Sequence, residues 1–152
     1  MPSTHRCAAQ AATIKSFVAL PYNNYSALMN AVVSVGPISV SGAAEPWQSY
    51  ETGVFNSNCG ADVDHAIVLD GYGHDASANL DYYLIRNSWG AGWGEAGYIR
   101  IKRVGDQTAE PCYTDNSPSD GDGCDDGPSS IQVCGLCGIL SDSSYPVGGA
   151  LA

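Results

Sequence analysis

The chain has 152 residues, which is enough for one ordinary domain and too few for two, so we expect a single domain over residues 1–152. Its 6 Lys and Arg stand against 16 Asp and Glu, which gives a formal net charge of −10. A surface this acidic repels polyanions, so nucleic acid is not expected as a partner. No apolar run reaches the roughly 20 residues of a membrane helix, so no membrane partner is expected either.

The cysteines bear on the compartment. Six of them in a small acidic domain favour oxidising surroundings, and one Asn-Tyr-Ser sequon at Asn24 points the same way. The opening residues MPSTHRCAAQAATIKS lack the apolar stretch of a secretion signal. Because these two signs conflict, we expect the sequence to begin inside a longer protein.

Short strand patterns dominate the chain, with one helix. Residues 11–20 are rich in β-branched and aromatic residues and end at Pro21, which predicts a strand. The run NNYSALMNAVVSVG predicts an amphipathic helix, capped by Asn24 and stopped by Gly36 and Pro37. The later runs PISVS, HAIVLDGYG, DYYLIR and GYIRIKR predict an antiparallel sheet or barrel.

Residues 104–130 differ from the rest because they consist largely of turn formers and acids. This composition predicts a long acidic, Cys-containing loop exposed to solvent. Its DGDGCDDG run has closely spaced carboxylates, but Cys124 occupies a ligand position of a calcium loop and the distal Glu is missing. A solvated loop is therefore favoured over a calcium site.

His65 and Asn87 are the candidate catalytic residues. His65 begins a predicted buried strand; alone, such a His is more often structural, and His5 and His74 lie in loop-like surroundings. No His shares metal-ligand spacing with Cys or carboxylates, so no metal site is expected. An Asn side-chain oxygen can fix the ring of a catalytic imidazole, and Asn87 precedes Trp89 and a glycine-rich turn. The alternative is a loop of packed aromatics.

The motifs VDHAIVLDGYG and YYLIRNSWGAGWGEAGYIRIKR resemble the C-terminal half of papain-family cysteine peptidases, the group of plant papains and animal cathepsins. The resemblance implies an α+β fold: the mainly antiparallel, β-barrel-like right-hand lobe of the papain-like fold, with one short helix and the acidic loop. It assigns His65 as catalytic base and Asn87 as the residue that orients it, while Trp89 covers their contact. It implies no cofactor.

The family's nucleophile signature, C-G-[SA]-C-[WY], is absent from these residues. We therefore expect the His- and Asn-bearing half of a cysteine-type endopeptidase, truncated and inactive alone, whose missing partner is the N-terminal Cys-bearing lobe. Two alternatives are a non-catalytic papain-like binding module and a subunit that pairs with a separately encoded Cys lobe. The resemblance further implies peptide or protein substrates, a propeptide or inhibitor, and a lysosomal, vacuole-like or extracellular location.

The resemblance also implies roles for the cysteines. It pairs Cys59 with Cys134, a bridge worth about 4 to 5 kcal/mol on the chain-entropy model. It leaves Cys7 free, because the matching family cysteine pairs with the missing lobe. Cys112, Cys124 and Cys137 depart from papain, and any two of them could pair.

The last implication concerns substrate binding. Val63 and Ala66 flank the base and, with Ser41, match walls of the family's main specificity pocket. Small, mostly apolar walls would accept a bulky hydrophobic side chain. Asp64 is expected to offer its backbone to substrate, although it could equally be an exposed turn acid.

Overall fold

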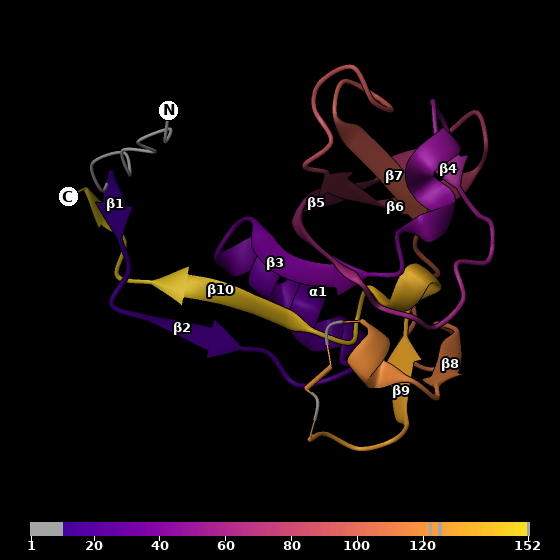
Figure 1. The fold of residues 1–152 in the computed structure, drawn as a ribbon. Coiled ribbons are helices and arrows are strands. Elements are labelled where there is room, and N and C mark those ends of the chain that lie inside the picture. Colours follow the sequence, from indigo (N-terminus) through magenta and orange to yellow (C-terminus); the bar gives the residue numbers. More distant parts are fainter. Residues whose placement is uncertain (1–10, 122, 125, 152) are drawn as a thin grey trace, which may run out of the picture.

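The computed structural model describes residues 11–121, 123–124 and 126–151 (Figure 1). Cys7 and His5 lie outside the described residues. The strands and helices, in chain order, are β1 (Ala12–Thr13), β2 (Ser16–Ala19), α1 (Tyr25–Ser34), β3 (Ile38–Gly42), the 3-10 helix η1 (Glu45–Ser49), β4 (Val54–Phe55), β5 (His65–Asp75), β6 (Leu80–Arg86), β7 (Tyr98–Lys102), β8 (Cys112–Asp115), η2 (Pro118–Asp120), β9 (Ile131–Cys134), η3 (Leu136–Gly138), β10 (Ser143–Val147) and β11 (Ala150–Leu151).

The main sheet has seven strands in the order β2-β10-β3-β5-β6-β7-β4. Neighbours are antiparallel except β4 and β7, which are parallel. This confirms the predicted α+β class with a mainly antiparallel sheet. The barrel-like closure is not found among the described residues, because β2 and β4 end the order as unpaired edges. A register shift between Leu69 and Gly71 interrupts the β5–β6 ladder, an irregularity of the kind that bends a sheet without closing it.

The α-helix found in the described part of the chain, α1, begins where the sequence predicts. The Asn24 side chain accepts a hydrogen bond from the Ala27 backbone N–H at 2.8 Å, which satisfies one of the free donors at the helix start. Leu28 and Ala31 are buried on the face turned to the sheet. Gly36 follows the helix with a φ of +117°, a conformation that glycine adopts without strain. Within the described residues no helix is long and apolar enough to span a bilayer.

The core lies between α1, η1 and one face of the central strands. Alternate residues of these strands point into it, which explains the period-two pattern of the sequence. The largest fully buried side chains are Trp47, Tyr83, Leu28, Ile38, Leu69, Ile85, Ile99, Ile101, Ile139 and Leu140. The core places β5 and β6 side by side in a fixed register, and these two strands carry the site described below.

A two-stranded arm extends from the main body. Strands β2 and β10 pair along it, and β1 pairs with β11 at its far end (Figure 1). All residues of β2 are exposed, including Phe17 at 67% and Val18 at 38%. Ile14 and Val147 add further exposed apolar surface. Large apolar side chains gathered on an arm in this way are typical of a surface that packs against another polypeptide.

The disulfide pairing differs from the expected Cys59–Cys134 bridge. Cys112 and Cys134 face each other across the antiparallel pair β8–β9, with Cα atoms 4.0 Å apart, and form one disulfide. Cys59 therefore pairs with Cys137, whose Cα lies 4.8 Å away. The strand register decides the outcome, because it brings Cys112 opposite Cys134. Cys124 is free and exposed.

The described part of segment 104–130 is not only a solvated loop. It contains β8 and η2, and three of its described residues are buried: Glu110, Asp115 and Pro118. Glu110 accepts hydrogen bonds from the Tyr83 hydroxyl and from the backbone N–H of Val104 and of Gly105. The acidic composition of the segment predicts solvent exposure, but Glu110 instead holds the start of the segment to the core.

Candidate active site

His65 and Asn87 lie at the same end of two paired strands. His65 is the first residue of β5, and Asn87 follows the last residue of β6. The antiparallel register pairs Val68 with Arg86, so the start of β5 lies beside the end of β6. The side chains of His65 and Asn87 therefore lie at the same end of these two central strands. The His65 Nε2 atom lies 2.9 Å from the Asn87 Oδ1 atom. Two residues 22 positions apart in sequence are therefore in hydrogen-bond contact.

This contact determines which ring nitrogen of the neutral imidazole carries the hydrogen. The Asn87 Oδ1 atom also accepts the Ser88 backbone N–H at 2.7 Å, so it is an acceptor for both neighbours. A carbonyl oxygen cannot donate, so the imidazole must donate from Nε2. The neutral ring then has its lone pair on Nδ1, which leaves that nitrogen able to take a proton from another group.

Two tryptophans contact the imidazole, and a third packs against one of them. Trp89 stacks on it, with ring centroids 5.3 Å apart and an interplanar angle of 27°. Trp47 approaches it edge-on, with centroids 6.3 Å apart. Trp93 contacts Trp89 edge-on at 5.0 Å and donates its Nε1 hydrogen to the Trp47 carbonyl at 3.2 Å. We call Trp47, Trp89 and Trp93 the indole cluster. Trp89, which is 39% exposed, covers one face of the imidazole, and buried Trp47 lies against its edge.

Trp47 is the member of this cluster that the sequence does not reveal. It is fully buried on η1, and the strand register places Gly42 opposite His65. A Cβ on Gly42 would lie 2.9 Å from the Trp47 Cη2 atom. The missing side chain at Gly42 therefore makes room for the indole beside the imidazole.

The glycine-rich turn after Asn87 gives Trp89 and Trp93 their positions. The Asn87 N–H donates to the Gly97 carbonyl at 2.9 Å, and the Gly97 N–H donates to the Trp93 carbonyl at 2.7 Å. Gly94 has a φ of +53°, and a Cβ there would lie 2.6 Å from the Tyr98 carbonyl oxygen. Only glycine tolerates both the left-handed conformation and this approach. The sequence pattern thus closes a tight turn under Asn87.

A shallow cavity of about 180 Å³ opens beside the imidazole, lined by Ala44, Glu45, Gln48, Asp64, His65 and Trp89. Its lining includes two carboxylates and no Lys or Arg. Asp64 accepts the Ala44 backbone N–H at 3.0 Å through its side chain. Its own N–H donates to the Gly42 carbonyl at 3.3 Å. The Asp64 backbone N–H is therefore already hydrogen-bonded within the protein, which leaves the backbone carbonyl as the group that could contact substrate.

The residues expected to wall a specificity pocket are only partly brought together. Ser41 and Ala66 are paired across β3 and β5, but Ser41 is buried and Ala66 is exposed. Ala66 lines a groove with Ser39, Ile67, Val68, Arg86, Asn87 and Ser88, whose volume is about 310 Å³. Val63 instead lines a different cavity. Val63 and Ala66 thus line two separate hollows, and Ser41 lines neither of them.

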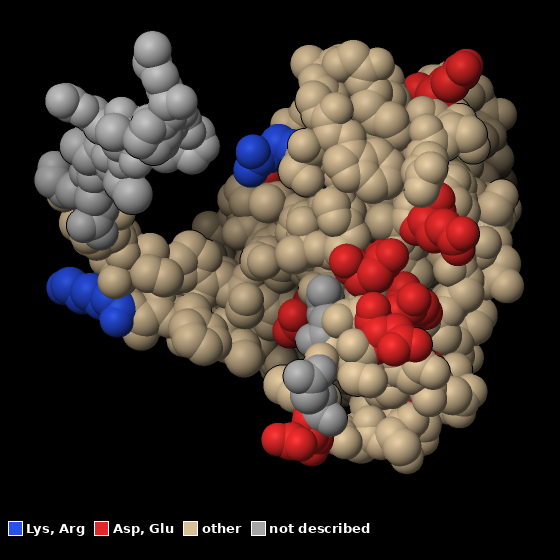
Figure 2. Space-filling model, viewed as in Figure 1, with Lys and Arg blue, Asp and Glu red and all other residues tan. Residues whose placement is uncertain are grey.

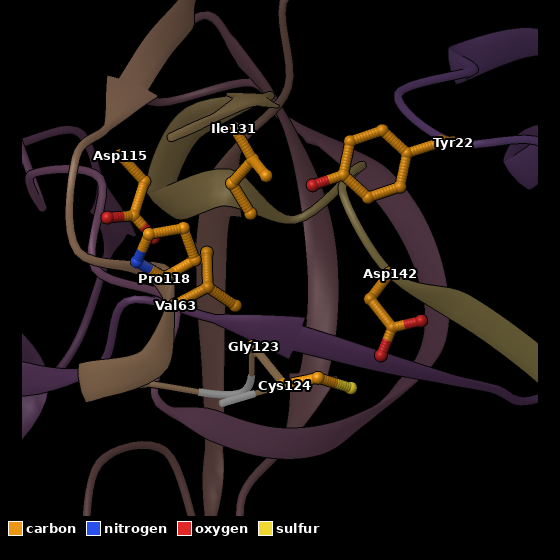
Figure 3. Close-up of a pocket in the computed structure, with 8 residues that line it drawn as sticks. All are labelled: Tyr22, Val63, Asp115, Pro118, Gly123, Cys124, Ile131 and Asp142. Atoms are coloured by element: carbon orange, nitrogen blue, oxygen red, sulfur yellow. The ribbon is translucent and has the colours of Figure 1, made fainter. Parts of the chain in front are cut away.

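The cavity at Val63 has a volume of about 210 Å³ and is lined by Tyr22, Val63, Asp115, Pro118, Gly123, Cys124, Ile131 and Asp142 (Figure 3). We call it the acidic cavity. The Tyr22 hydroxyl points across it toward Ile131 and Val63 (Figure 3). Burial and then the carboxylates of Asp142 and Asp115 raise the pKa of Tyr22 above its ordinary value of 10.0. The Ser41 hydroxyl donates to the Asp142 carboxylate at 3.2 Å.

The charge of the surface matches this lining. Acidic side chains gather on the face over β8 and β9, and few basic ones appear in the same view (Figure 2). Within the described residues, no group of three or more His, Cys, Asp or Glu side chains is arranged to hold a metal ion. The site places an imidazole hydrogen-bonded to Asn87 beside a hollow that carries two carboxylates.

Comparison with known sequences gives a consistent relationship. The sequence model described as papain family cysteine protease matches residues 2–120. Papaya proteinase 4 of Carica papaya is 39% identical over 127 residues, which cover 82% of this chain and 28% of that protein. Ananain of Ananas comosus is 37% identical over 135 residues, which cover 89% of this chain and 32% of that protein. The chain thus spans 28 to 32% of the length of these two relatives.

Solved structures agree with the sequence comparison. The bromelain protease from Ananas comosus, in complex with the E64 inhibitor, superposes with a TM-score of 0.65 at 37% identity, covering 88% of this chain and 50% of that one. Digestive procathepsin L 3 of the Tenebrio molitor larval midgut superposes with a TM-score of 0.64 at 28% identity, covering 90% of this chain and 36% of that one.

Proposed function

Because this chain belongs to the papain family of cysteine proteases, we propose that it is the half of a cysteine endopeptidase that supplies the catalytic base His65 and the orienting residue Asn87. The observation that carries the proposal is the 2.9 Å contact from His65 Nε2 to Asn87 Oδ1 beneath Trp89. A binding module gains nothing from an imidazole held in one tautomer. A proton acceptor gains a correctly oriented lone pair.

The reaction follows from the free Nδ1 atom of His65. A cysteine thiol beside it transfers its proton to Nδ1, which leaves a thiolate and an imidazolium. The thiolate attacks the peptide carbonyl carbon, and the imidazolium gives its proton to the departing amine as the C–N bond breaks. Water then attacks the resulting thioester, with His65 again taking a proton, and this releases the acid and restores the thiol. Asn87 keeps the ring aligned through both proton transfers.

We propose that the thiol comes from a polypeptide segment outside these 152 residues. The nucleophile signature of the family does not occur in the sequence, and four of the described cysteines are held in disulfides. Cys124 is free, but it belongs to the acidic cavity and not to the hollow beside His65. The chain alone should therefore not cleave peptides. The segment could be the preceding lobe or a separately encoded subunit.

The surface that receives this lobe is proposed to be the groove formed by Ser39, Ala66, Ile67, Val68, Arg86, Asn87 and Ser88. It lies on central strands of the sheet and includes Asn87 itself. A helix bearing the thiol and lying there would bring sulfur toward the imidazole. The exposed apolar side chains of the β2–β10 arm, including Phe17 and Val147, offer a second contact to the same lobe.

The proposed substrates are peptides, and the acidic cavity adds a second proposed preference to the expected one for bulky hydrophobic side chains. Val63, Pro118 and Ile131 give it apolar walls, while Asp115 and Asp142 add carboxylates, and no Lys or Arg lines it. Such walls suit the apolar stem and charged end of Lys or Arg better than a purely hydrophobic side chain. Val63, Asp64, Ala66, Ser41 and Trp89 remain proposed substrate-binding residues. We expect Ser41 to act through Asp142.

Other partners and the compartment follow from the same reasoning. A propeptide or an inhibitor is proposed to occupy the cleft, because solved relatives include a procathepsin and an E64 complex. The two disulfides and the family support a lysosomal, vacuole-like or extracellular location.

A chimera tests the proposed function. The cysteine-bearing segment of papaya proteinase 4, joined in front of this chain, should hydrolyse a fluorogenic peptide, whereas the chain alone should not. His65→Ala in the chimera should abolish turnover, and His74→Ala serves as the matched control that retains it. E-64 should label the thiol of the chimera far faster than that of the His65→Ala variant. Hydrolysis by the purified chain alone that is lost with His65→Ala would refute the proposal, as would a labelling rate that His65→Ala leaves unchanged.

A further inference from the structure

The sequon at Asn24 lies at the boundary of an element near the surface. Asn24 is the only Asn in the sequence followed two positions later by Ser or Thr. It immediately precedes α1, with an extended backbone at φ −111° and ψ 98°, and it is partly exposed. Ser26 is exposed. An Asn-x-Ser sequence accepts a glycan where its amide reaches solvent.

The two amide atoms of Asn24 have different environments. Oδ1 accepts the Ala27 N–H at 2.8 Å. Nδ2 has no hydrogen bond within the described part of the chain, yet it is not among the buried unpaired side-chain atoms there. It is therefore open to solvent. The neighbouring Asn23 differs, because its Nδ2 donates to Gln132 at 2.7 Å and its Oδ1 accepts from Cys134 at 2.9 Å.

We propose that Asn24 carries an N-linked glycan. In the transfer, Nδ2 attacks the C1 atom of an oligosaccharide held on a lipid pyrophosphate. The C1–N bond forms, the C1–O bond to phosphate breaks, and Nδ2 loses one proton. The carbonyl Oδ1 is not consumed, so the helix cap to Ala27 survives the modification. The same side chain thus starts α1 through its oxygen and bears the sugar through its nitrogen.

The disulfides support this site independently of proteolysis. The Cys59–Cys137 and Cys112–Cys134 bridges form in oxidising compartments, and the secretory pathway is where N-glycans are added. Asn24 is not among the residues that line the hollow beside His65 or the groove at Asn87. A glycan here leaves the proposed catalytic edge free.

Three substitutions separate the two roles of Asn24. Ser26→Ala removes the sequon but leaves the cap intact. Asn24→Asp also removes it and keeps an oxygen that caps well, while Asn24→Gln removes both sequon and cap. Ser26→Thr keeps a valid sequon. Each full chain, fused to a secretion signal, is produced in eukaryotic cells, and its intact mass is compared before and after peptide N-glycosidase treatment.

The wild-type chain and Ser26→Thr should carry an added mass that the enzyme removes, leaving Asp at position 24. Ser26→Ala and Asn24→Asp should lack it, and of the unglycosylated chains only Asn24→Gln should unfold at lower urea concentration. A chain that is retained in the cells is assayed in the microsomal fraction by the same mass measurement. A wild-type chain without the added mass in both fractions would overturn the proposal, and so would an added mass that persists in Ser26→Ala.

Discussion

Replacing Asn87 by Ala isolates the contact on which the proposed chemistry depends. The change removes the oxygen that accepts the His65 Nε2 hydrogen at 2.9 Å. A hydrogen bond of this neutral type is worth about 1 kcal/mol net, which corresponds to about a fivefold change in an equilibrium constant. In the neutral ring, the ratio of Nε2-protonated to Nδ1-protonated tautomer should therefore fall about fivefold.

Nuclear magnetic resonance measures this ratio directly. Long-range ¹H–¹⁵N correlations distinguish the two ring nitrogens in each tautomer, and they are recorded under alkaline conditions in which the spectra themselves show neutral rings. His74 provides an internal control. Its ring contacts Asp81 through Nδ1 at 2.7 Å, far along the sheet from Asn87, so its signals should not change.

The result that refutes the reasoning is equally direct. If the chain with Asn87→Ala remains folded, by its urea midpoint and circular dichroism, and His65 retains the wild-type tautomer ratio, then Asn87 does not orient the ring. In that case the indole cluster alone would hold the imidazole, and Asn87 would lose its proposed catalytic role.

Other parts of the fold give three further predictions. Gly94→Ala should lower the free energy of unfolding, measured by urea titration, by about 2 kcal/mol or more, because of left-handed backbone strain and the close Tyr98 carbonyl. Gly92→Ala is the control: the space around Gly92 is open, so the same titration should show almost no change. Peptide mapping without reduction should recover Cys59 linked to Cys137 and Cys112 linked to Cys134, and a Cys59–Cys134 peptide would contradict the fold. The two disulfides close loops of 78 and 22 residues, which on the chain-entropy model stabilise the folded state by about 4.5 and about 3 kcal/mol. Burial raises the pKa of Glu110 above 4.5, so the folded state holds this proton more tightly than the unfolded chain does. The contribution of Glu110 to stability should therefore be largest below pH 4.5 and decline as pH rises toward the folded pKa, and Glu110→Gln should remove that decline from urea midpoints measured against pH.

Local patterns predict the helix α1 and the central strands β3, β5, β6 and β7, because each of these elements depends on nearby residues. The helix requires a cap at Asn24 and a stop at Gly36, and both are visible in the sequence. The strands β5, β6 and β7 have β-branched and aromatic runs whose alternate residues are buried. The patterns do not indicate the short strands β4, β8, β9, β10 and β11. For β8, the Pro, Asp and Ser that follow it dominate the composition of its surroundings.

Pairings between distant residues were harder to predict. The resemblance predicts a Cys59–Cys134 disulfide, yet the register of β8 and β9 places Cys134 opposite Cys112, and these two form the disulfide. The sequence does not show which residues of two strands lie opposite each other, so it cannot predict how the additional cysteines pair. Whether the two edges of a sheet pair is likewise a property of the assembled sheet, and within the described residues β2 and β4 remain edge strands.

The contact of His65 with Asn87 was expected from their motifs, whereas Trp47 was not. In the run AAEPWQSY the Trp stands among turn formers, with no period to show which way it faces. Its position beside the imidazole depends on Gly42 lying opposite His65 across two strands. That relation exists only after β3 and β5 have paired.

The indole cluster gives this protein a built-in optical probe. The chain has three tryptophans in all, and every one belongs to the cluster around His65. Its tryptophan emission therefore arises beside His65. Proton uptake by the ring, arrival of a thiol-bearing lobe or entry of a peptide can each be followed in the unlabelled chain as a change in fluorescence.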